Sequence, residues 1–507
     1  MEANKSLVSV AQKWGMRSTV IPTQKLARIQ KKSLRMFNSS ATGRLESTWS
    51  TNPTTADQII YQNLRTLVAR SREQAMNNDH ARKFLQMVRD NVAGPNGFKL
   101  ASKIKDPTGT PDILASQAIE DAFNDWSKAG NYDVTGTLSR SDGERLGVQT
   151  FAKDGELIGI IHYGYEASPW GFAVEIVDSM TLLPNHYLKL NNGNFIRHGI
   201  EFNSFNRPVA YHFAIQSEDQ MGYYQTGVSG NARRIPADRV IHCFNAEMVG
   251  QKRGLPAMST ALWRMRMLSA FEDSAVTAAR VGASNMGFFR DAEGEINDEI
   301  PMDAEPGTFQ NIGSLDFVPF APKYPEANFE PFCRSMLRSI ASSMGVSYNT
   351  LANDLTNVNF SSIRQGALDE REVWKGLQQW FIGAWCTPLF NKWIEYALLN
   401  KKIILPSGKA LPFEKIEKFK KVSFRGRGWS WIDPTSEVAA NEKAVANGFK
   451  SRTQVIEEGG GESEDVWTQL SQDNEDMDTL GIDRPLPNSF IIPQTDQNQT
   501  TPIQPKE

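Results

Sequence analysis

The spacing of hydrophobic residues alternates between helical and strand-like along the chain. Apolar residues at helical spacing predict a helix over 54–92, which the polar run Asn77-Asn-Asp79 interrupts. Gly94-Pro-Asn-Gly97 ends this pattern, and a further helix is expected over 111–129. Between 150 and 245 the pattern changes to short runs of β-branched and aromatic residues, which predict strands.

Two of these runs predict a β-hairpin. Residues 199–205 and 209–215 are strand-like and flank the turn sequence Asn206-Arg-Pro208. We therefore expect the two runs to pair with each other.

From 256 to 286 the pattern returns to helix with unusually small residues. At 1.5 Å per residue this helix would be roughly 45 Å long. One side carries Leu262, Met265, Leu268 and Val276. Small-residue surfaces let helices approach closely, either within one chain or between subunits. The small residues that we single out are Ser269, Ala270, Ala275, Ala278, Ala279 and Gly282.

A short β-like segment follows over 287–320, and residues 329–344 are again helical, with Gly345 in place to end the helix. The segment 353–360 is polar and turn-rich. Its composition is also typical of an ordinary surface loop with a helix N-cap at its end.

The next long helix is expected to begin with Ser361 or Ser362 as its N-cap residue. Pro388 should kink or end that helix, because proline lacks the backbone N–H. Residues 436–475 predict one or two short helices. Together these patterns predict an α+β protein.

Composition narrows the possibilities further. The 507 residues suffice for roughly two to four domains, and the sequence has no 18-residue apolar run of the kind that forms an ordinary transmembrane helix. Three widely spaced cysteines argue against a disulfide framework and exclude a four-thiolate zinc site: Cys243, Cys333 and Cys386.

The net charge of −3 hides two oppositely charged ends. Residues 1–44 carry nine basic residues and one acidic residue, a net charge of +8, whereas 454–507 carry twelve acids and two bases, a net charge of −10. The remaining 45–453 is close to neutral at −1. The basic end is either a flexible tail or a segment that touches nucleic acid or an acidic partner. Residues 485–507 are poor in apolar residues and are expected to be disordered.

Motifs of catalysis and cofactor binding are missing from the sequence. Gly408-Lys409 lacks the spacing and the following Ser or Thr of a phosphate-binding loop. The six histidines are scattered without a His-Glu-x-x-His pair, and no Gly-x-Ser-x-Gly elbow is present. A chain of this length without such motifs favours a structural or assembly role.

Two further segments carry a family resemblance. A Gly-Gln-x-Arg-Gly-x-Pro pattern occupies 250–256, just before the small-residue helix. Asp354 is followed by Asn359-Phe-Ser-Ser-Ile-Arg364. In these motifs the sequence resembles the lambda-type family of tailed-phage portal proteins, although Phe360 stands where the family usually has Tyr.

Further motifs fall in the order of that family, and the resemblance covers roughly 55–480. They are Ser71-Arg-Glu-Gln-Ala-Met-Asn-Asn78, Val92-Ala-Gly-Pro-Asn-Gly97, Asp154-Gly-Glu156, Arg234-Ile-Pro-Ala-Asp-Arg-Val-Ile-His242, Ile340-Ala-Ser-Ser-Met-Gly-Val346 and Trp431-Ile-Asp-Pro434.

The resemblance implies the portal fold, with a mixed α/β wing, a helical stem, a small β-containing clip and a helical crown. By order along the chain, the parts would be a basic tail (1–54), the wing (55–255), a stem helix (256–286), the clip (287–320), a wing return (321–388), a C-terminal crown region (389–484) and a disordered tail (485–507).

Within this scheme the resemblance implies roles for two sets of residues. The small residues of 256–286 would pack the stem helix against its copies around a ring. The polar loop would face a DNA channel, through Asn353, Asp354, Thr356, Asn357 and Asn359. This loop has one acid and no base, which suits a conduit that must not hold its cargo, because each Lys or Arg on a phosphate adds affinity.

The resemblance also implies partners and a location. The chain would form a homo-oligomeric ring, usually of twelve subunits, at one vertex of the phage head, with host cytoplasm as its location during assembly. Double-stranded DNA would pass without sequence specificity, and the terminase motor, the major capsid protein, the scaffold and head-completion or tail adaptor proteins would bind. No catalytic residue, metal or cofactor is implied. Two alternatives stay open: another head–tail connector or scaffold component without a channel, and a hydrolase or nuclease that uses scattered acids and histidines.

Overall fold

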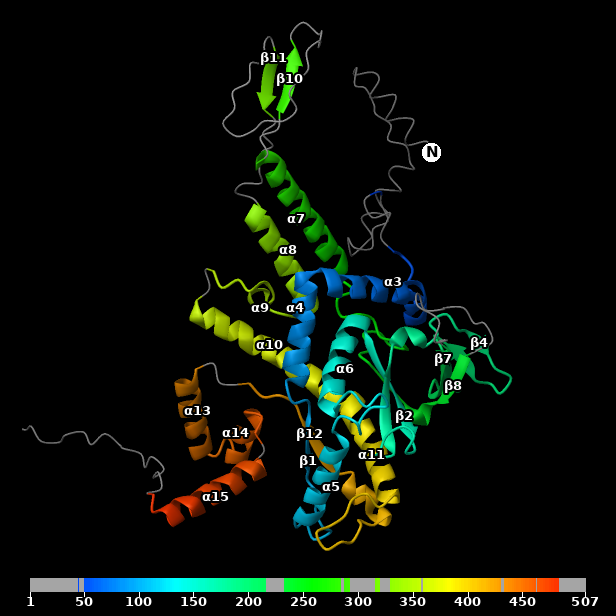
Figure 1. Ribbon diagram of the computed structural model, residues 1–507, viewed down its shortest axis with the longest axis vertical. Helices are drawn as coiled ribbons and strands as arrows, with labels where there is room; N and C mark the ends of the chain where they lie inside the picture. The colour runs from blue at the N-terminus through cyan, green and yellow to red at the C-terminus, as the bar shows by residue number, and fades with distance from the viewer. Residues whose placement is uncertain are drawn as a thin grey trace, which may run out of the picture. The chain divides into compact units, whose positions relative to one another are not determined.

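The computed structural model describes residues 44, 50–215, 232–283, 287–291, 315–319, 329–356, 359–429, 433–461 and 463–482. The chain divides into two units, Met1–Thr55 and Ala56–Glu507. All helices and strands described below belong to the second unit (Figure 1). None of the described helices is long and apolar enough to cross a membrane.

The expected N-terminal helices are confirmed. Helix α3 (Ala56–Asn77) and helix α4 (Asp79–Val88) are separated at Asn78, which accepts a hydrogen bond from the Ala81 N–H as the N-cap of α4. A π-helical turn, η2 (Arg89–Ala93), then ends at Gly94, whose φ is +68°. Helix α5 (Ile113–Trp126) lies within the range 111–129 expected from the sequence.

A three-stranded antiparallel sheet lies at the centre of the core. Its order is β3-β2-β9, from β2 (Glu156–Tyr163), β3 (Phe172–Val177) and β9 (Val240–Phe244). Helix α6 (Arg140–Asp154) runs directly into β2. The sequence patterns did not predict α6, because Gly143, Gly147 and several polar residues weaken its periodicity.

A second sheet contains the expected hairpin. Its order is β4-β5-β6-β7-β8, and β6 pairs antiparallel with β7 across a turn in which Asn206 has a φ of +58°. The strands are β4 (Leu188–Lys189), β5 (Phe195–Arg197), β6 (Ile200–Phe202), β7 (Pro208–Ala214) and β8 (Ala232–Pro236). Short 3₁₀ turns flank this region at Ser179–Thr181 and Ala237–Arg239.

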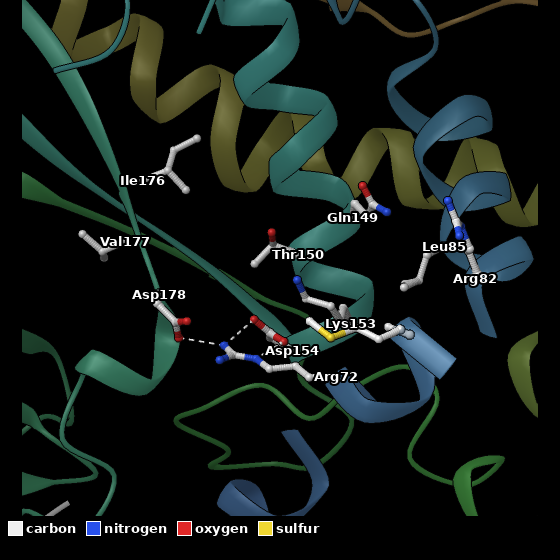
Figure 2. A pocket seen from close by; sticks show the side chains of 12 residues that line it. Arg72, Arg82, Leu85, Gln149, Thr150, Lys153, Asp154, Ile176, Val177 and Asp178 are labelled. Atoms are coloured by element: carbon white, nitrogen blue, oxygen red, sulfur yellow. Dashed lines mark hydrogen bonds and ion pairs between the residues drawn. The ribbon is translucent and has the colours of Figure 1, made fainter. Parts of the chain in front are cut away.

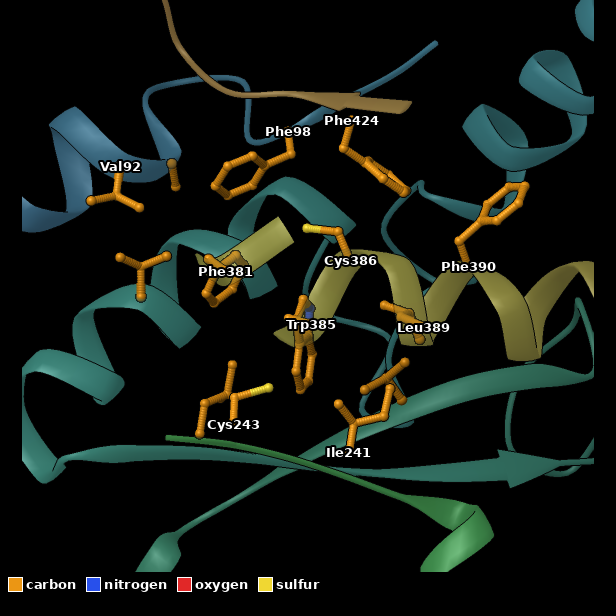
Figure 3. Close-up of a cluster of buried hydrophobic side chains, with 14 of the residues drawn as sticks. Val92, Phe98, Ile241, Cys243, Phe381, Trp385, Cys386, Leu389, Phe390 and Phe424 are labelled. Atoms are coloured by element: carbon orange, nitrogen blue, oxygen red, sulfur yellow. The ribbon is translucent and has the colours of Figure 1, made fainter. Parts of the chain in front are cut away.

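A long bent helix packs on the first sheet. Helix α10 (Phe360–Phe381) continues through a π-helical turn, η5 (Ile382–Cys386), into α11 (Thr387–Leu399). The helix does not end at Pro388, which was one of the two outcomes expected there: Pro388 lies in the first turn of α11, where its missing N–H is tolerated after the π turn. Figure 3 shows Phe381, Trp385 and Leu389 pointing from this helix into the buried cluster.

The segment after α11 also belongs to the main core. Strand β12 (Val422–Arg425) pairs antiparallel with β1 (Lys99–Ser102), although more than 300 residues separate them. Two short helices directly before β12 in sequence, η6 (Phe413–Lys415) and α12 (Ile416–Phe419), contact α11. Residues 389–425 therefore pack mainly with the core that the earlier part of the chain forms.

The small-residue helix is shorter than expected. Helix α7 spans Leu262–Ala283, 22 residues or roughly 33 Å, because 256–261 forms turns. It packs against α8 (Phe329–Met344), where the ring of Phe271 lies 5.5 Å from that of Phe329 and 4.9 Å from that of Phe332. Strands β10 (Gly287–Asp291) and β11 (Leu315–Pro319) between these helices in sequence pair antiparallel.

Helix α8 ends as expected, with Gly345 at a φ of +70°. After α9 (Tyr348–Ala352), the N-cap of α10 is Asn359, which accepts from the Ser362 N–H. The assignment of Ser361 or Ser362 as the cap was therefore wrong, because the helix begins two or three residues earlier.

The C-terminal region contains three helices where one or two short ones were expected. They are α13 (Pro434–Ala446), α14 (Arg452–Glu458) and α15 (Ser463–Leu480). Helices α13 and α14 bury none of their residues. Arg425 connects this region to β12 by an ion pair with Glu457 at 2.8 Å.

Candidate functional site

Several of the motifs that carry the family resemblance converge on one buried cluster, which we call the polar junction: Arg253, Glu156, His242, Arg72 and Asp154. Arg253 is fully buried. Its Nε donates to both oxygens of Glu156 at 2.9 Å, and its Nη atoms donate to Glu156 and to backbone carbonyls of Ser179, Leu182 and His198. All three guanidinium nitrogens therefore have acceptors inside the chain.

Glu156 is the acceptor at the centre of this cluster. It starts β2, is fully buried, and also receives the His242 Nε2 at 2.9 Å and the Gly254 N–H at 3.2 Å. Burial acts to raise its pKa, but the Arg253 charge and the His242 hydrogen bond outweigh burial and lower the pKa of Glu156 to about 2. The carboxylate is thus held ionised opposite a buried cation.

The second half of the polar junction joins α3 to the end of α6 (Figure 2). Arg72 donates from Nε and Nη2 to Asp154 at 2.9 and 2.7 Å, and from Nη2 to Asp178 at 2.7 Å. Burial acts to lower the pKa of Arg72, but the hydrogen bonds to Asp154 and Asp178 raise it overall. The Ser71 hydroxyl adds a 2.5 Å hydrogen bond to the Lys153 carbonyl.

Two glycines let two backbone segments of the polar junction approach each other closely. A Cβ at Gly254 would lie 1.9 Å from the Gly155 carbonyl oxygen, and a Cβ at Gly155 would lie 2.3 Å from the Leu255 carbonyl carbon. Gly155 also has a φ of +92°. The chain passes this contact immediately before the turns that lead into α7, so the junction fixes where the small-residue helix leaves the sheet-containing core.

One exposed face of α7 carries no charged residue, although the exposed Arg264, Arg266 and Asp273 lie beside it. We call it the stem stripe: Trp263, Met267, Ala270, Ser274 and Thr277, spaced three or four residues apart on one helix face. Trp263 is 68% exposed and Met267 is 46% exposed. The Ser274 and Thr277 hydroxyls donate to helix carbonyls four residues earlier. The stripe thus holds large apolar groups and hydroxyls with internal partners.

The predicted stem-packing residues lie on different sides of α7. Ala270 is on the stem stripe, whereas Ala275 is buried within the chain. Ser269 is half-buried and accepts from Asn78 Nδ2 at 3.0 Å. Ala278 and Ala279 are partly exposed, and Gly282 lies in the last turn of the helix. Of the apolar side predicted from sequence, Leu262, Met265 and Leu268 are buried, but Val276 is 59% exposed.

The predicted channel loop is mostly exposed, and its acid is already engaged. Asn353, with a φ of +52°, Thr356 and Asn359 are exposed. Asp354 accepts from the Tyr348 hydroxyl at 2.6 Å and from the Thr356 N–H at 2.9 Å. The hydrogen bonds from Thr356 and Tyr348 hold the pKa of Asp354 well below its usual range. Asn357 lies outside the described residues.

The basic residues beside this loop are paired as well. Arg334 lies 2.6 Å from Glu330 and 3.6 Å from Asp354, and Arg364 lies 3.7 Å from Glu437. The described loop therefore combines neutral polar side chains with charges that are locally compensated.

The sequence motifs contain the residues of the polar junction but do not reveal their role. Arg253 within Gly-Gln-Lys-Arg-Gly has the composition of a surface turn, and Glu156 opens a strand of otherwise apolar residues. An acid at the start of a fully buried strand was the one available signal, because such a charge needs a buried partner. Among the described residues, no group of three or more His, Cys, Asp or Glu is placed to hold a metal ion.

Comparison with known families decides the assignment. Residues 42–378, about two thirds of the chain, match the model of the phage portal protein, lambda family. The chain belongs to the lambda family of phage portal proteins. The resemblance seen in the motifs is thereby confirmed.

Individual portal proteins match over nearly the whole chain. A probable portal protein of Halomonas phage phiHAP-1 is 30% identical over 501 residues, which cover 96% of this chain and 94% of that protein. Portal protein B of Escherichia phage lambda is 21% identical over 490 residues, with 87% and 89% coverage.

Two solved structures of gene transfer agent particles are also similar to the chain. A native virion chain gives a TM-score of 0.39 at 11% identity and covers 82% of this chain and 97% of its own length. A chain from the neck of the native particle, computed with C12 symmetry, gives 0.38 at 11% identity, with 83% and 99% coverage.

The family assignment establishes the general function. The chain has a portal function at the head–tail junction of a phage particle, as a structural part of the virion. The expected α+β class is also confirmed, since helices and antiparallel sheets share one core.

Proposed function

We propose that this portal protein forms a closed ring, with twelve copies as the expected number, around a channel that passes double-stranded DNA during packaging and ejection. The observation that carries the proposal is the stem stripe. A soluble helix usually exposes charged residues. Helix α7 exposes Arg264, Arg266 and Asp273, but the stripe between them has no charge and carries Trp263, Met267, Ala270, Ser274 and Thr277. Such a face suits burial against another copy.

The parts of the ring follow from the packing. The wing would comprise 55–255 together with 321–425, because β12 pairs with β1 in one core. Helices α7 and α8 would form the stem, and the β10–β11 hairpin would form the clip. The crown would then begin after β12, with helices α13–α15, and not at residue 389.

The loop 353–359 would face the channel. Apart from the exposed Leu355, its described side chains are polar or locally paired, so the described part of the loop presents no free cation to DNA. Because DNA carries one negative charge per about 1.7 Å of axis, a channel lined with unpaired Lys or Arg would bind its cargo tightly and in a salt-dependent way. Neutral polar contacts permit sliding and read no bases.

The proposed partners are those of a portal vertex. The terminase motor would dock during packaging and would hydrolyse ATP, so the portal itself needs no catalytic residue, metal or cofactor. The major capsid protein and scaffold would surround the ring during assembly in host cytoplasm, and head-completion or tail adaptor proteins would bind later. The charged ends 1–44 and 454–507 would serve such protein contacts.

A charge placed on the stem stripe tests the proposal. Trp263→Glu would bury an unpaired carboxylate between subunits, which costs about 3 kcal/mol and weakens each contact about 100-fold. We expect rings from the natural chain and mainly monomers from Trp263→Glu in native mass spectrometry. Phe205→Glu is the matched control, because Phe205 is 87% exposed in the β6–β7 turn. If Trp263→Glu forms rings at the same protein concentrations as the natural chain, the proposed role of the stripe is contradicted.

A further inference from the structure

A pocket of about 470 Å³ lies beside the polar junction (Figure 2). Three of its lining residues, Arg72, Ala75 and Met76, come from the motif at 71–78 that carries part of the family resemblance. Of these three, only Arg72 takes part in the polar junction. Met76 is 80% exposed, so the pocket opens to solvent and a ligand can reach it. The motif therefore contributes to a second surface whose role is not yet accounted for.

The charges that line the pocket leave an excess of one positive charge. They are three cations and two carboxylates, a net charge of 3 − 2 = +1: Arg72, Arg82, Lys153, Asp154 and Asp178. Both carboxylates accept a hydrogen bond from Arg72 at 2.7 Å. In the part of the chain that the structure describes, the side chains of Arg82 and Lys153 form no hydrogen bond or ion pair. One further carboxylate would therefore balance the lining and find two unpaired cations.

The rest of the lining combines neutral donors with an aliphatic surface. Figure 2 shows Thr150 and Lys153 extending from α6, with Ile176 and Val177 on the β3 side of the pocket. Gln149 lines the pocket from α6 as well, and neither its amide nor the Thr150 hydroxyl bonds to another described side chain. A ligand that uses the whole lining carries a carboxylate next to an apolar group.

The charge of the lining favours a protein segment over nucleic acid. DNA presents one negative charge per about 1.7 Å of its axis, so a duplex would bring many phosphates to a site that can balance one anion. A protein segment with a single acidic residue beside an apolar residue matches both the charge and the aliphatic surface.

We propose that this pocket binds one acidic residue of a partner protein together with the apolar residue next to it. The carboxylate lies within reach of Lys153 and Arg82, and the apolar side chain covers Ile176 and Val177. Hydrogen bonds from a cation to a carboxylate are roughly twice as strong as neutral ones, so the two cations supply most of the affinity. The inference goes beyond the proposed ring and does not depend on it, because one chain supplies the whole lining.

Lys153→Met tests the charge and leaves the fold in place. The Lys153 ammonium has no partner in the described chain, so the melting temperature should stay close to that of the natural chain. The probe is a tripeptide of 4-fluorophenylalanine, Glu and Leu, blocked at both ends, and fluorine NMR measures its binding to the full chain. We expect Lys153→Met to bind it about tenfold more weakly, because one charge-assisted hydrogen bond is lost. Lys83→Met is the matched control: Lys83 is half-buried on α4 and does not line the pocket, so binding should not change.

Three competitors identify the class of ligand. The same tripeptide with Gln in place of Glu should bind about tenfold more weakly, since it lacks the carboxylate. Acetate should compete poorly, since it lacks the apolar group, and a short DNA duplex should not displace the probe more strongly than the unlabelled tripeptide does. Absence of probe binding, unchanged binding in Lys153→Met, equal binding of the Gln peptide, equal competition by acetate or stronger displacement by DNA would each overturn the proposal. Ring formation is measured separately, so these outcomes leave the proposed function standing.

Discussion

Arg253 is a buried cation that the fold surrounds completely with acceptors. Its contacts reach β2, the turn before the second sheet and the backbone of His198, so one side chain connects four segments that are distant in sequence. A buried ion pair of this kind contributes little net stability against an apolar replacement of both partners. It becomes costly when one partner is removed, because the other charge is left unpaired.

We therefore expect Glu156→Gln to destabilise the chain by about 3–5 kcal/mol, because Arg253 would keep its charge without a carboxylate. Urea denaturation of the two chains measures the difference. Glu175→Gln is the matched control: Glu175 pairs with His162 at 2.7 Å, but both side chains are about one quarter to one third exposed. That change should cost less than about 1 kcal/mol. Equal costs for the two variants would contradict the assigned role of the junction.

The stability of the folded chain should depend on pH through His198, whose backbone carbonyl accepts from Arg253. Burial and the Arg253 charge lower the pKa of His198 to about 4, below its ordinary 6.5. The unfolded chain binds a proton in this window and the folded chain does not, so stability falls as pH decreases from 6.5 toward 4. The difference corresponds to at most about 3 kcal/mol.

Denaturation midpoints at several pH values between 6.5 and 4 test this dependence. His198→Asn should flatten the slope, and Asn tolerates the φ of +52° at this position. Burial also lowers the pKa values of His186 and His212, so these two residues should account for the pH dependence of stability that remains in the variant. An unchanged slope in the variant would show that His198 does not carry the effect.

Single side chains were the least predictable from sequence. The amphipathic pattern placed Leu262, Met265 and Leu268 correctly, since local periodicity determines which side of a helix is buried. Val276 follows the same pattern but is exposed, although its neighbour Ala275 is buried, because the side of α7 that is buried changes along the helix. The pairing of Asp354 with Tyr348 depends on the tight turn after α9, which spacing alone does not give.

At the scale of elements, the entry into α7 depends on backbone contact. We expect Gly254→Ala to destabilise the chain by more than about 3 kcal/mol or to prevent folding, because its Cβ would meet the Gly155 carbonyl oxygen at 1.9 Å and no side chain can yield. Thermal unfolding of the purified variant measures this.

Gly376→Ala is the control within a helix. Gly376 lies inside α10 with no atom within 4 Å of the added Cβ, so alanine should stabilise by roughly 0.5–1 kcal/mol. A Gly254→Ala chain as stable as Gly376→Ala would mean that the two segments do not meet as described.

The start of α10 offers a second test at this scale. Asn359→Ala removes the side chain that caps the Ser362 N–H and should cost about 1 kcal/mol, whereas Ser361→Ala should change stability by a few tenths. Denaturant midpoints distinguish the two. A larger effect from Ser361→Ala would restore the cap position inferred from sequence.

Helices with a clear apolar face were predictable, and those whose packing relies on glycine were not. In α6, Gly147 allows Leu157 to approach, since a Cβ added at this glycine would lie 2.7 Å from Leu157 Cδ2. In the sequence, a residue without a side chain inside a helix looks like a helix breaker. The π turn before α11 was equally hidden, because it shifts the hydrogen-bond register and leaves the composition unchanged.

At the scale of the molecule, long-range pairing is the argument for the proposed wing boundary. Sequence order put the crown boundary at residue 389, whereas the pairing of β12 with β1 supports the proposed boundary after β12. Local patterns contain no information on which distant strand is the partner. The motifs, by contrast, identified the family, and several of them contribute residues to the polar junction.

The nearly neutral charge of residues 45–453, the body of the chain between its charged ends, bears on how a ring of copies would interact with DNA. Residues 45–453 carry a net charge of −1, and the described part of the predicted channel loop has its charges paired. Repeated around a ring, such a body would attract DNA weakly and leave it free to slide. The charged ends would then act on proteins and not on the cargo.

Electron microscopy of the purified natural chain tests the ring most directly. We predict closed rings, twelve-fold in the expected case, with Trp263 and Met267 of α7 buried between neighbouring subunits and the loop 353–359 at the central opening. Monomers at high concentration, or rings in which the stem stripe stays exposed to solvent, would contradict the account.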